Sequence, residues 1–193
     1  MPTHQERTRA TRRALIDAGR RLFAERGYAG VSVGELAQAA GVTTGAIYHQ
    51  FASKEGLFLA VYDELVQATW VRVQAARQAS DHPSLLSDCA AYLDACAEPA
   101  FTRITADGPA VIGWDHLVTQ TSQLIEISLT DARDRGEIID VPMGPLSRML
   151  AAALKEAGVI IATAADPAAA RDQADLTARH LITGLLRGRP GPG

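Results

Sequence analysis

Apolar residues recur every three to four positions along most of the chain, which is the spacing of helices that bury one face. The first such stretch runs from about Thr8 to Glu25, with Leu15, Ala18 and Leu22 on its apolar side. Alternating apolar and polar segments rich in β-branched side chains, which are typical of strands, are missing. The pattern therefore predicts an all-α protein.

Three further helix starts follow closely, each marked by a residue that can cap free backbone N–H groups. Ser32 is followed three residues later by Glu35, which gives a capping box, and Gly41 supplies the stop. Thr43 is the predicted cap of a short third helix, and Ser53 is that of a fourth. Two short helices joined by a turn at Gly41 have the spacing of a helix-turn-helix unit.

Longer helices are predicted in the rest of the chain. Their expected spans are 57–78, 84–96, one that starts at Asp107-Gly108-Pro109 and ends at Gly136, 146–161, and one from Asp166-Pro167 to about Leu186. We accordingly expect a three-helix helix-turn-helix domain with a basic N-terminal arm at 1–55. A larger helical domain for ligand binding and dimerisation is expected at 56–187, and a flexible tail at 188–193.

The composition is that of a globular protein. Of the 193 residues 47% are hydrophobic and 21% are charged, which excludes a disordered chain. No apolar run approaches the roughly 18 residues of a membrane span. The polar start lacks the apolar stretch of a secretory signal, so a cytoplasmic location is expected, with no membrane partner.

Charge is divided unevenly along the chain. Residues 1–55 carry eight basic and five acidic residues, whereas the remaining 138 residues carry 11 basic and 17 acidic ones. Six arginines fall within Arg7–Arg21. A basic end on an acidic body suggests one domain that faces a polyanion, although a solvated helix face would give the same signal.

Motifs of enzymes are absent from the sequence. It holds no glycine-rich phosphate loop, no Gly-x-Ser-x-Gly elbow and no His-Glu-x-x-His zinc pair, and its five histidines lack ligand spacing. We therefore predict no catalytic residue, no metal and no cofactor. Cys89 and Cys96 lie seven residues apart on one helix, roughly 10 Å along its axis and too far for a disulfide. They are expected to be buried core residues, with a thiol redox sensor as the alternative.

The third predicted helix divides into an inward and an outward face. Ile47 is expected to point toward the core, and Thr44 and Tyr48 lie on the opposite side. A threonine can contact a base edge through its hydroxyl or a thymine through its methyl. The small Gly45 allows close approach to DNA, and Tyr48, His49 and Lys54 are suited to phosphate oxygens.

These residues resemble a known family. The runs that carry the likeness are Leu22-Phe-Ala-Glu-Arg-Gly-Tyr and Ser32-Val-Gly-Glu-Leu-Ala-Gln-Ala-Ala-Gly-Val-Thr-Thr-Gly-Ala-Ile-Tyr-His-Gln-Phe-Ala-Ser-Lys-Glu-Gly-Leu57. About residues 8–57 strongly resemble the N-terminal domain of tetracycline-repressor-type (TetR/AcrR) transcriptional regulators. The resemblance implies that Thr43, Thr44, Gly45, Tyr48 and Lys54 face DNA and that Ser32 touches a phosphate. It also implies a homodimer whose helical C-terminal domain binds a small effector.

Two apolar stripes near the C-terminus are the predicted dimer surface. Their members are Leu146, Met149, Leu150, Ala153 and Leu154 on one helix, then Ala178, Leu181, Ile182 and Leu185 on the next. Two such helices from each subunit would make a four-helix bundle. The alternative is that both stripes are buried inside one subunit. A symmetric dimer predicts a palindromic operator on double-stranded DNA.

Large and polar side chains of the middle helices are candidates for an effector pocket. They are Trp70, Tyr92, Phe101, Trp114, His116 and Gln120, and a residue of this kind taken singly is more often plain core. The expected function is that of a sequence-specific regulator, a repressor released from its operator by an unidentified small molecule. The alternatives are a DNA-binding regulator without an effector and a thiol sensor acting through Cys89 and Cys96.

Overall fold

The chain is helical throughout the part that the computed structural model describes, residues 3–80 and 84–186. The helices are α1 (His4–Arg26), α2 (Val33–Ala40), α3 (Thr44–Phe51), α4 (Lys54–Gln78), α5 (Leu85–Cys96), α6 (Pro99–Val111), α7 (Trp114–Asp134), α8 (Met143–Thr163) and α9 (Pro167–Thr183). An isolated antiparallel bridge joins Ile138 to Leu186. The all-α prediction is confirmed, and the predicted tail at 188–193 lies outside the described residues.

Local capping signals place the short helices at the N-terminal end. The Ser32 hydroxyl accepts a hydrogen bond from the Glu35 N–H, and the Glu35 carboxylate accepts one from the Ser32 N–H, so the predicted capping box is confirmed. Gly41 ends α2 with a positive φ of 68°. The cap predicted at Thr43 is wrong in one respect, because its side chain makes no capping hydrogen bond and is exposed.

The helix start predicted at Asp107-Gly108-Pro109 is wrong, because these residues lie in the last turns of α6. That helix starts at Pro99, a position where the missing N–H costs nothing. Pro109 cannot donate a backbone hydrogen bond, and α6 ends two residues after it. The next helix begins at Trp114 after Gly113, whose φ of 93° strongly favours glycine.

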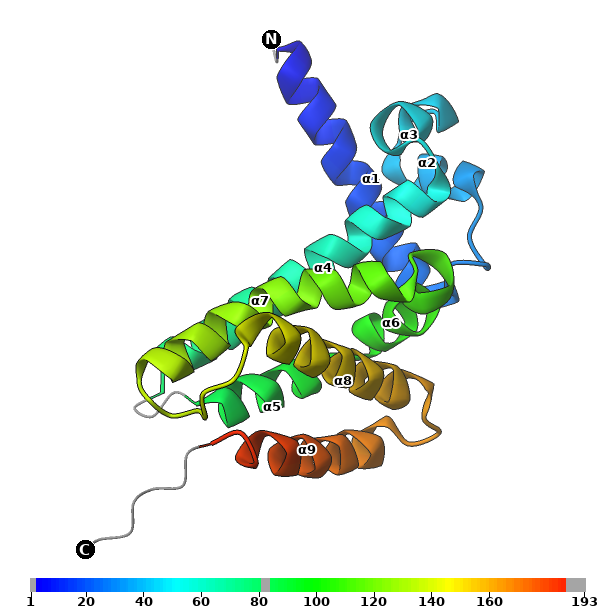
Figure 1. Ribbon diagram of the computed structural model, residues 1–193. Helices are drawn as coiled ribbons and strands as arrows, with labels where there is room; N and C mark the ends of the chain where they lie inside the picture. Colours follow the sequence, from blue (N-terminus) through cyan, green and yellow to red (C-terminus); the bar gives the residue numbers. More distant parts are fainter. Residues whose placement is uncertain (1–2, 81–83, 187–193) are drawn as a thin grey trace, which may run out of the picture.

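The buried side chains form two cores. One holds the inner faces of α1, α2, α3 and the first half of α4, including Leu15, Phe23, Ile47 and Phe58. The other lies among α5, α7, α8 and α9. In Figure 1, α1–α3 gather at one end of the molecule, α9 lies on the outer side of the other end, and the 25-residue α4 runs between them. Through α4, the two halves share one continuous element.

Gly56 in the first turn of α4 allows the end of α3 to approach closely. A Cβ on residue 56 would lie 2.0 Å from the Phe51 carbonyl oxygen. We therefore expect Gly56→Ala to lower the free energy of unfolding by roughly 1–3 kcal/mol or more, as overpacking does. Urea denaturation measures the change.

Gly144→Ala is the matched control, because a Cβ there meets no atom within 4 Å and residue 144 is also in a first helical turn, that of α8. It should be neutral or stabilise by up to about 1 kcal/mol. Equal unfolding midpoints for the two variants would contradict the close approach at Gly56.

Candidate nucleic-acid interface and ligand cavity

Helix α3 presents a polar face because its apolar face is fixed to the N-terminal core. Ile47 is fully buried and Phe51 is partly buried. On the other side Thr44, Gly45 and His49 are exposed, and the Tyr48 side chain is 56% exposed. A large aromatic residue this exposed contributes little to packing and remains available for a partner.

The remaining predicted DNA contacts lie at the starts of the neighbouring helices. Thr43 and Ser32 precede α3 and α2 and are exposed, whereas Lys54 opens α4 and is half-buried. The Lys54 ammonium lies 4.0 Å from the centre of the Tyr28 ring, a cation–π contact that holds it at the helix start. We call Ser32, Thr43, Thr44, Gly45, Tyr48, His49 and Lys54 the recognition surface; Figure 1 shows the helices that carry them side by side.

Arg12 fixes the orientation of α3 and was not singled out from the sequence. Its guanidinium lies 4.5 Å from the centre of the Phe51 ring and donates a 3.4 Å hydrogen bond to the Gln50 carbonyl. A cation at the C-terminal end of a helix is favoured by the helix dipole. The sequence showed only a run of arginines, with nothing to separate this one from its neighbours.

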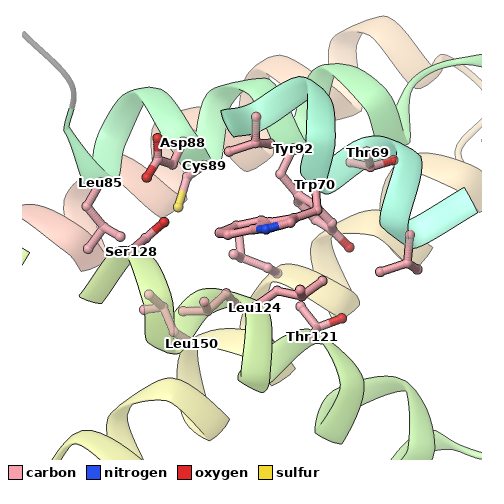
Figure 2. Close-up of a pocket in the computed structure, with 14 residues that line it drawn as sticks. Thr69, Trp70, Leu85, Asp88, Cys89, Tyr92, Thr121, Leu124, Ser128 and Leu150 are labelled. Atoms are coloured by element: carbon pink, nitrogen blue, oxygen red, sulfur yellow. The ribbon is translucent and has the colours of Figure 1, made fainter. Parts of the chain in front are cut away.

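A cavity lies among α4, α5, α7 and α8, with about 520 Å³ of empty space counting its opening to solvent. Its walls are mostly apolar, as ligand pockets are. The lining residues are Val66, Thr69, Trp70, Val73, Leu85, Asp88, Cys89, Tyr92, Thr121, Leu124, Ile125, Ser128, Leu150 and Leu154. Figure 2 shows the Trp70 indole lying across the middle of this ring of side chains. Two of the six residues predicted for a pocket, Trp70 and Tyr92, are thus brought together.

The other four predicted pocket residues lie elsewhere, which corrects the sequence expectation. Phe101 is buried in the second core, and Trp114 is 38% exposed beside a separate surface hollow. Gln120 donates a 2.8 Å hydrogen bond to Asp63, with the His116 ring 3.7 Å from the same carboxylate. Helix α7 instead turns a different set toward the cavity, namely Thr121, Leu124, Ile125 and Ser128.

One end of the cavity holds a closed network of polar groups. Arg77 is buried and donates to the Asp88 carboxylate at 3.0 Å and to the Ser128 hydroxyl at 3.1 Å. Its other terminal nitrogen lies 3.3 Å from an Asp131 carboxylate oxygen. Burial raises the pKa of Asp88, and the Ser128 and Arg77 contacts oppose that rise. Charge at this end is paired within the protein.

The opposite end carries a buried cation without a counter-charge among the described residues. Lys155 of α8 is 2% exposed, and its ammonium donates a 2.9 Å hydrogen bond to the Tyr62 hydroxyl. Its nitrogen lies 5.2 Å and 5.5 Å from the centres of the Tyr62 and Tyr92 rings. Burial lowers the pKa of Lys155 to about 8. The only sequence signal was a lone lysine within an apolar stripe.

The residues predicted for the dimer surface divide into buried and exposed sets. Leu150, Leu154 and Ile182 are buried in the subunit's own core, and Leu146, Ala178 and Leu185 pack partly against it. By contrast, Met149 is 72% and Leu181 57% exposed, and Ala153 is exposed as well. An apolar groove runs between α8 and α9, with Ala153, Ala157, Ile160, Ala178 and Leu181 along it. Burial inside one subunit thus accounts for part of the two stripes, and the dimer surface stays a prediction for the exposed part.

Both cysteines are buried and free. Burial raises the pKa of Cys89 to about 12 and that of Cys96 to about 11. Since the thiolate is the reactive form, neither is poised to react at neutral pH. This burial weighs against the thiol-sensor alternative.

Comparison with known proteins identifies the family. Residues 15–61 match the family described as bacterial regulatory proteins, tetR family, and residues 83–185 match the tetracyclin repressor-like C-terminal domain. The chain belongs to the TetR family. The resemblance that the helix-turn-helix residues suggested is therefore confirmed, and it extends over the helical domain that forms the cavity.

Relatives of this TetR-family protein are regulators. A TetR-family transcriptional regulator from Pectobacterium atrosepticum has 30% identity and a TM-score of 0.80, over 97% of this chain and 99% of that one. The transcriptional repressor AcnR of Corynebacterium glutamicum is 46% identical over 54 residues, 28% of this chain and 29% of AcnR. The A-factor receptor protein of Streptomyces griseus is 28% identical over 141 residues, 69% of this chain and 48% of the receptor. These two matches thus span less than half of each curated relative.

Among the described residues, none of the helices is long and apolar enough to cross a bilayer.

Because Lys155 is buried without a counter-charge, Lys155→Met should raise the free energy of unfolding at pH 7 by roughly 1–3 kcal/mol. The unfolded chain, with a lysine pKa of 10.5, binds more protons than the folded one between about pH 8 and 10.5. The contribution of the lysine to stability should therefore rise with pH across that window, so the advantage of the variant over wild type should shrink. The buried cysteines and tyrosines, whose pKa values are raised by burial, contribute with the opposite sign in both proteins. Urea denaturation at pH 7, 8, 9 and about 10.5 measures both effects.

The neighbouring titratable groups, Tyr62, Tyr92 and Cys96, are present in both proteins, so the comparison isolates the lysine. A variant less stable than wild type at pH 7 would mean that the ammonium is needed by the apo fold.

Proposed function

We propose that this TetR-family protein is a homodimeric, sequence-specific repressor, which a small-molecule effector releases from a palindromic operator. The observation that carries the proposal is the polar, exposed face of α3, held outward by the burial of Ile47. The exposed second helix of a helix-turn-helix fits the major groove of DNA.

The recognition surface divides into two kinds of contact. Thr44 and Gly45 at the first turn of α3 are placed to approach base edges, where a hydroxyl and a methyl discriminate among bases. Ser32, Thr43, Tyr48, His49 and Lys54 suit phosphate oxygens, which set the register without reading sequence. The contact between Arg12 and the end of α3 supports this orientation.

Dimerisation is proposed through the exposed apolar face of α8 and α9. Met149, Ile160 and Leu181 are more than half exposed on these two helices, which is costly for a monomer. Packing the same face of a second copy against it would bury these side chains and give a two-fold axis. A two-fold axis places two copies of α3 on successive half-sites of a palindrome.

The effector is proposed to act through the helices that join the cavity to the DNA-binding end. The Asp107 carboxylate of α6 accepts a 2.6 Å hydrogen bond from the Tyr28 N–H in the turn after α1. The Tyr28 ring in turn makes the cation–π contact with Lys54 of the recognition surface. The cavity is lined by α4, which begins at Lys54. A ligand that favours one position of α4 would shift the two copies of α3 relative to each other.

The regulator without an effector stays the second candidate. The apolar cavity favours the effector-responsive function, because a purely structural domain would gain stability by filling such a space.

Selection of genomic DNA tests the proposed function. Purified protein is mixed with sheared bacterial genomic DNA at roughly 0.15 M salt, and the retained fragments are sequenced. One enriched palindrome is the expected result. Thr44→Ala should then weaken binding to that palindrome by roughly 1–3 kcal/mol while leaving binding to random DNA unchanged.

Lys54→Ala is the matched comparison, because a phosphate contact acts on every sequence. It should weaken selected and random DNA alike and reduce the slope of log affinity against log salt by about 1. Absence of any enriched sequence, or equal losses of Thr44→Ala on both DNAs, would argue against readout by α3.

The dimer surface is tested by placing a charge in the groove between α8 and α9. Leu181→Glu should give a monomeric mass at micromolar concentration, because a carboxylate would be buried unpaired at the interface. Light scattering measures the mass. Val71→Glu, at an exposed apolar residue on α4, should leave a dimer. A monomeric wild-type protein, or a Leu181→Glu dimer, would overturn this surface.

A further inference from the structure

The buried cation of the C-terminal domain lies beside the cavity wall, with its nitrogen 5.5 Å from the ring centre of the lining residue Tyr92. We call Lys155, Tyr62, Tyr92 and Cys96 the Lys155 cluster. The Lys155 ammonium has one hydrogen-bond partner in the described residues, the Tyr62 hydroxyl at 2.9 Å. No carboxylate among the described residues lies within 4 Å of it. An ammonium offers three N–H donors, so its hydrogen-bonding capacity is largely unused.

The cluster continues the cavity by about one helical turn. On α4, Tyr62 lies four residues before the lining residue Val66. On α5, Cys96 lies four residues after Tyr92, which belongs both to the cluster and to the cavity wall. On α8, Lys155 directly follows the lining residue Leu154. The same direction on three helices leads from the apolar cavity to the ammonium.

Two more polar groups near this end lack partners. The hydroxyls of Tyr92 and Thr121 both belong to the cavity wall and are buried without a nitrogen or oxygen partner in the described part of the chain. The Tyr92 hydroxyl has only the weakly hydrogen-bonding Cys96 thiol recorded beside it. A Cβ at Gly158 would lie 3.3 Å from the Cys96 Sγ and 3.6 Å from the Tyr92 hydroxyl oxygen, so this position of α8 packs directly against the cluster. Buried polar groups in folded proteins are nearly always satisfied, so unpartnered ones point to an absent partner.

The two ends of the cavity therefore differ in what they can offer a ligand. At the Arg77 end, the cation is already paired with Asp88 and Asp131 and donates to Ser128. At the Lys155 end, the described groups around the cation are tyrosines and the Cys96 thiol, without a carboxylate. A ligand's negative charge would compete with two carboxylates at the first end and would meet none in the described surroundings of the second.

We propose that the effector is an organic acid whose carboxylate binds the Lys155 ammonium, while its apolar part fills the cavity around Trp70. This inference rests on the proposed function and specifies the ligand class of that same site. A carboxylate offers acceptors to the free N–H groups of Lys155 and to the Tyr92 and Thr121 hydroxyls. It would also supply the counter-charge that a buried ammonium otherwise lacks.

Matched pairs of acids and their neutral amides test this proposal. Trp114→Phe leaves Trp70 as the sole tryptophan, so its fluorescence reports on the cavity. The homodimer in this background is titrated with decanoate and decanamide, and with 4-phenylbutyrate and 4-phenylbutyramide, at pH 7. Isothermal calorimetry repeats each titration on wild type. At least one acid should bind about tenfold or more tightly than its amide.

Lys155→Met provides the decisive variant, since it removes the charge and keeps the length of the side chain. It should weaken binding of the acid by about tenfold or more and change binding of the amide by less than about threefold. Arg148→Met is the matched control, because Arg148 is an exposed cation on the same helix, paired with Asp115. This control should keep the preference for the acid. Unfolding midpoints show that each variant is folded.

Three results would overturn the proposal. They are equal affinity for acid and amide in wild type, no detectable binding of either acid at millimolar concentration, and equal losses for acid and amide in Lys155→Met. The proposed release from DNA can fail on its own. If an acid binds through Lys155 but leaves the affinity for the operator unchanged, the binding site stands and the release mechanism is refuted. If only neutral ligands release the protein from its operator, the proposed regulatory function stands, and the proposal that the effector is an organic acid is refuted.

Discussion

Helix α4 contributes side chains to both hydrophobic cores of the protein. Leu57, Phe58 and Val61 pack with the DNA-binding helices, and Val66 and Val73 face the cavity further along. Three short helices bury too little apolar surface to be stable alone, so they depend on the first half of α4. A helix transmits a shift along its length because its backbone hydrogen bonds resist local distortion. The recognition surface and the cavity therefore cannot rearrange independently.

The contacts between α6 and the turn after α1 strengthen that dependence. Asp107 holds the Tyr28 backbone, and Arg103 and Asp107 lie close enough to Gly27 that a Cβ there would meet them within 3 Å. The Tyr28 ring packs edge-on against Phe58 and also carries Lys54. One aromatic residue thus contacts the N-terminal core and the recognition surface while its backbone is bound by the C-terminal domain. This arrangement gives the proposed effector response a physical route of direct contacts.

The polar groups at the two ends of the cavity differ in whether they are paired within the protein. The Arg77 network is internally paired, as buried charges usually are. Lys155 departs from that rule, and two hydroxyls beside the cavity stay unpartnered among the described residues. Departures of this kind concentrate at functional sites, where a ligand completes what the fold leaves open. The exposed apolar groove between α8 and α9 is likewise unusual for a protein surface, and we propose that a second subunit covers it.

Local signals in the sequence determined the helical class, the helix-turn-helix and the residues on its outer face. Capping boxes, stop glycines and the spacing of Ile47 and Tyr48 act within a few residues, so they can be read without knowing the fold. The pocket could be found only in part. Trp70 and Tyr92 face the cavity, whereas Trp114, His116 and Gln120 do not, because α7 turns another face toward it and residue size alone does not show which face that is.

Only the tertiary structure decided what depends on several helices at once. In the sequence, Lys155 is one charged residue within an apolar stripe. Its separation from any carboxylate arises because α4 and α5 pack tyrosines around it. The sequence also could not divide the α8 and α9 stripes into buried and exposed residues, because that division depends on which neighbouring helix covers each turn. Periodicity fixes which residues share a face, and packing alone fixes what that face meets.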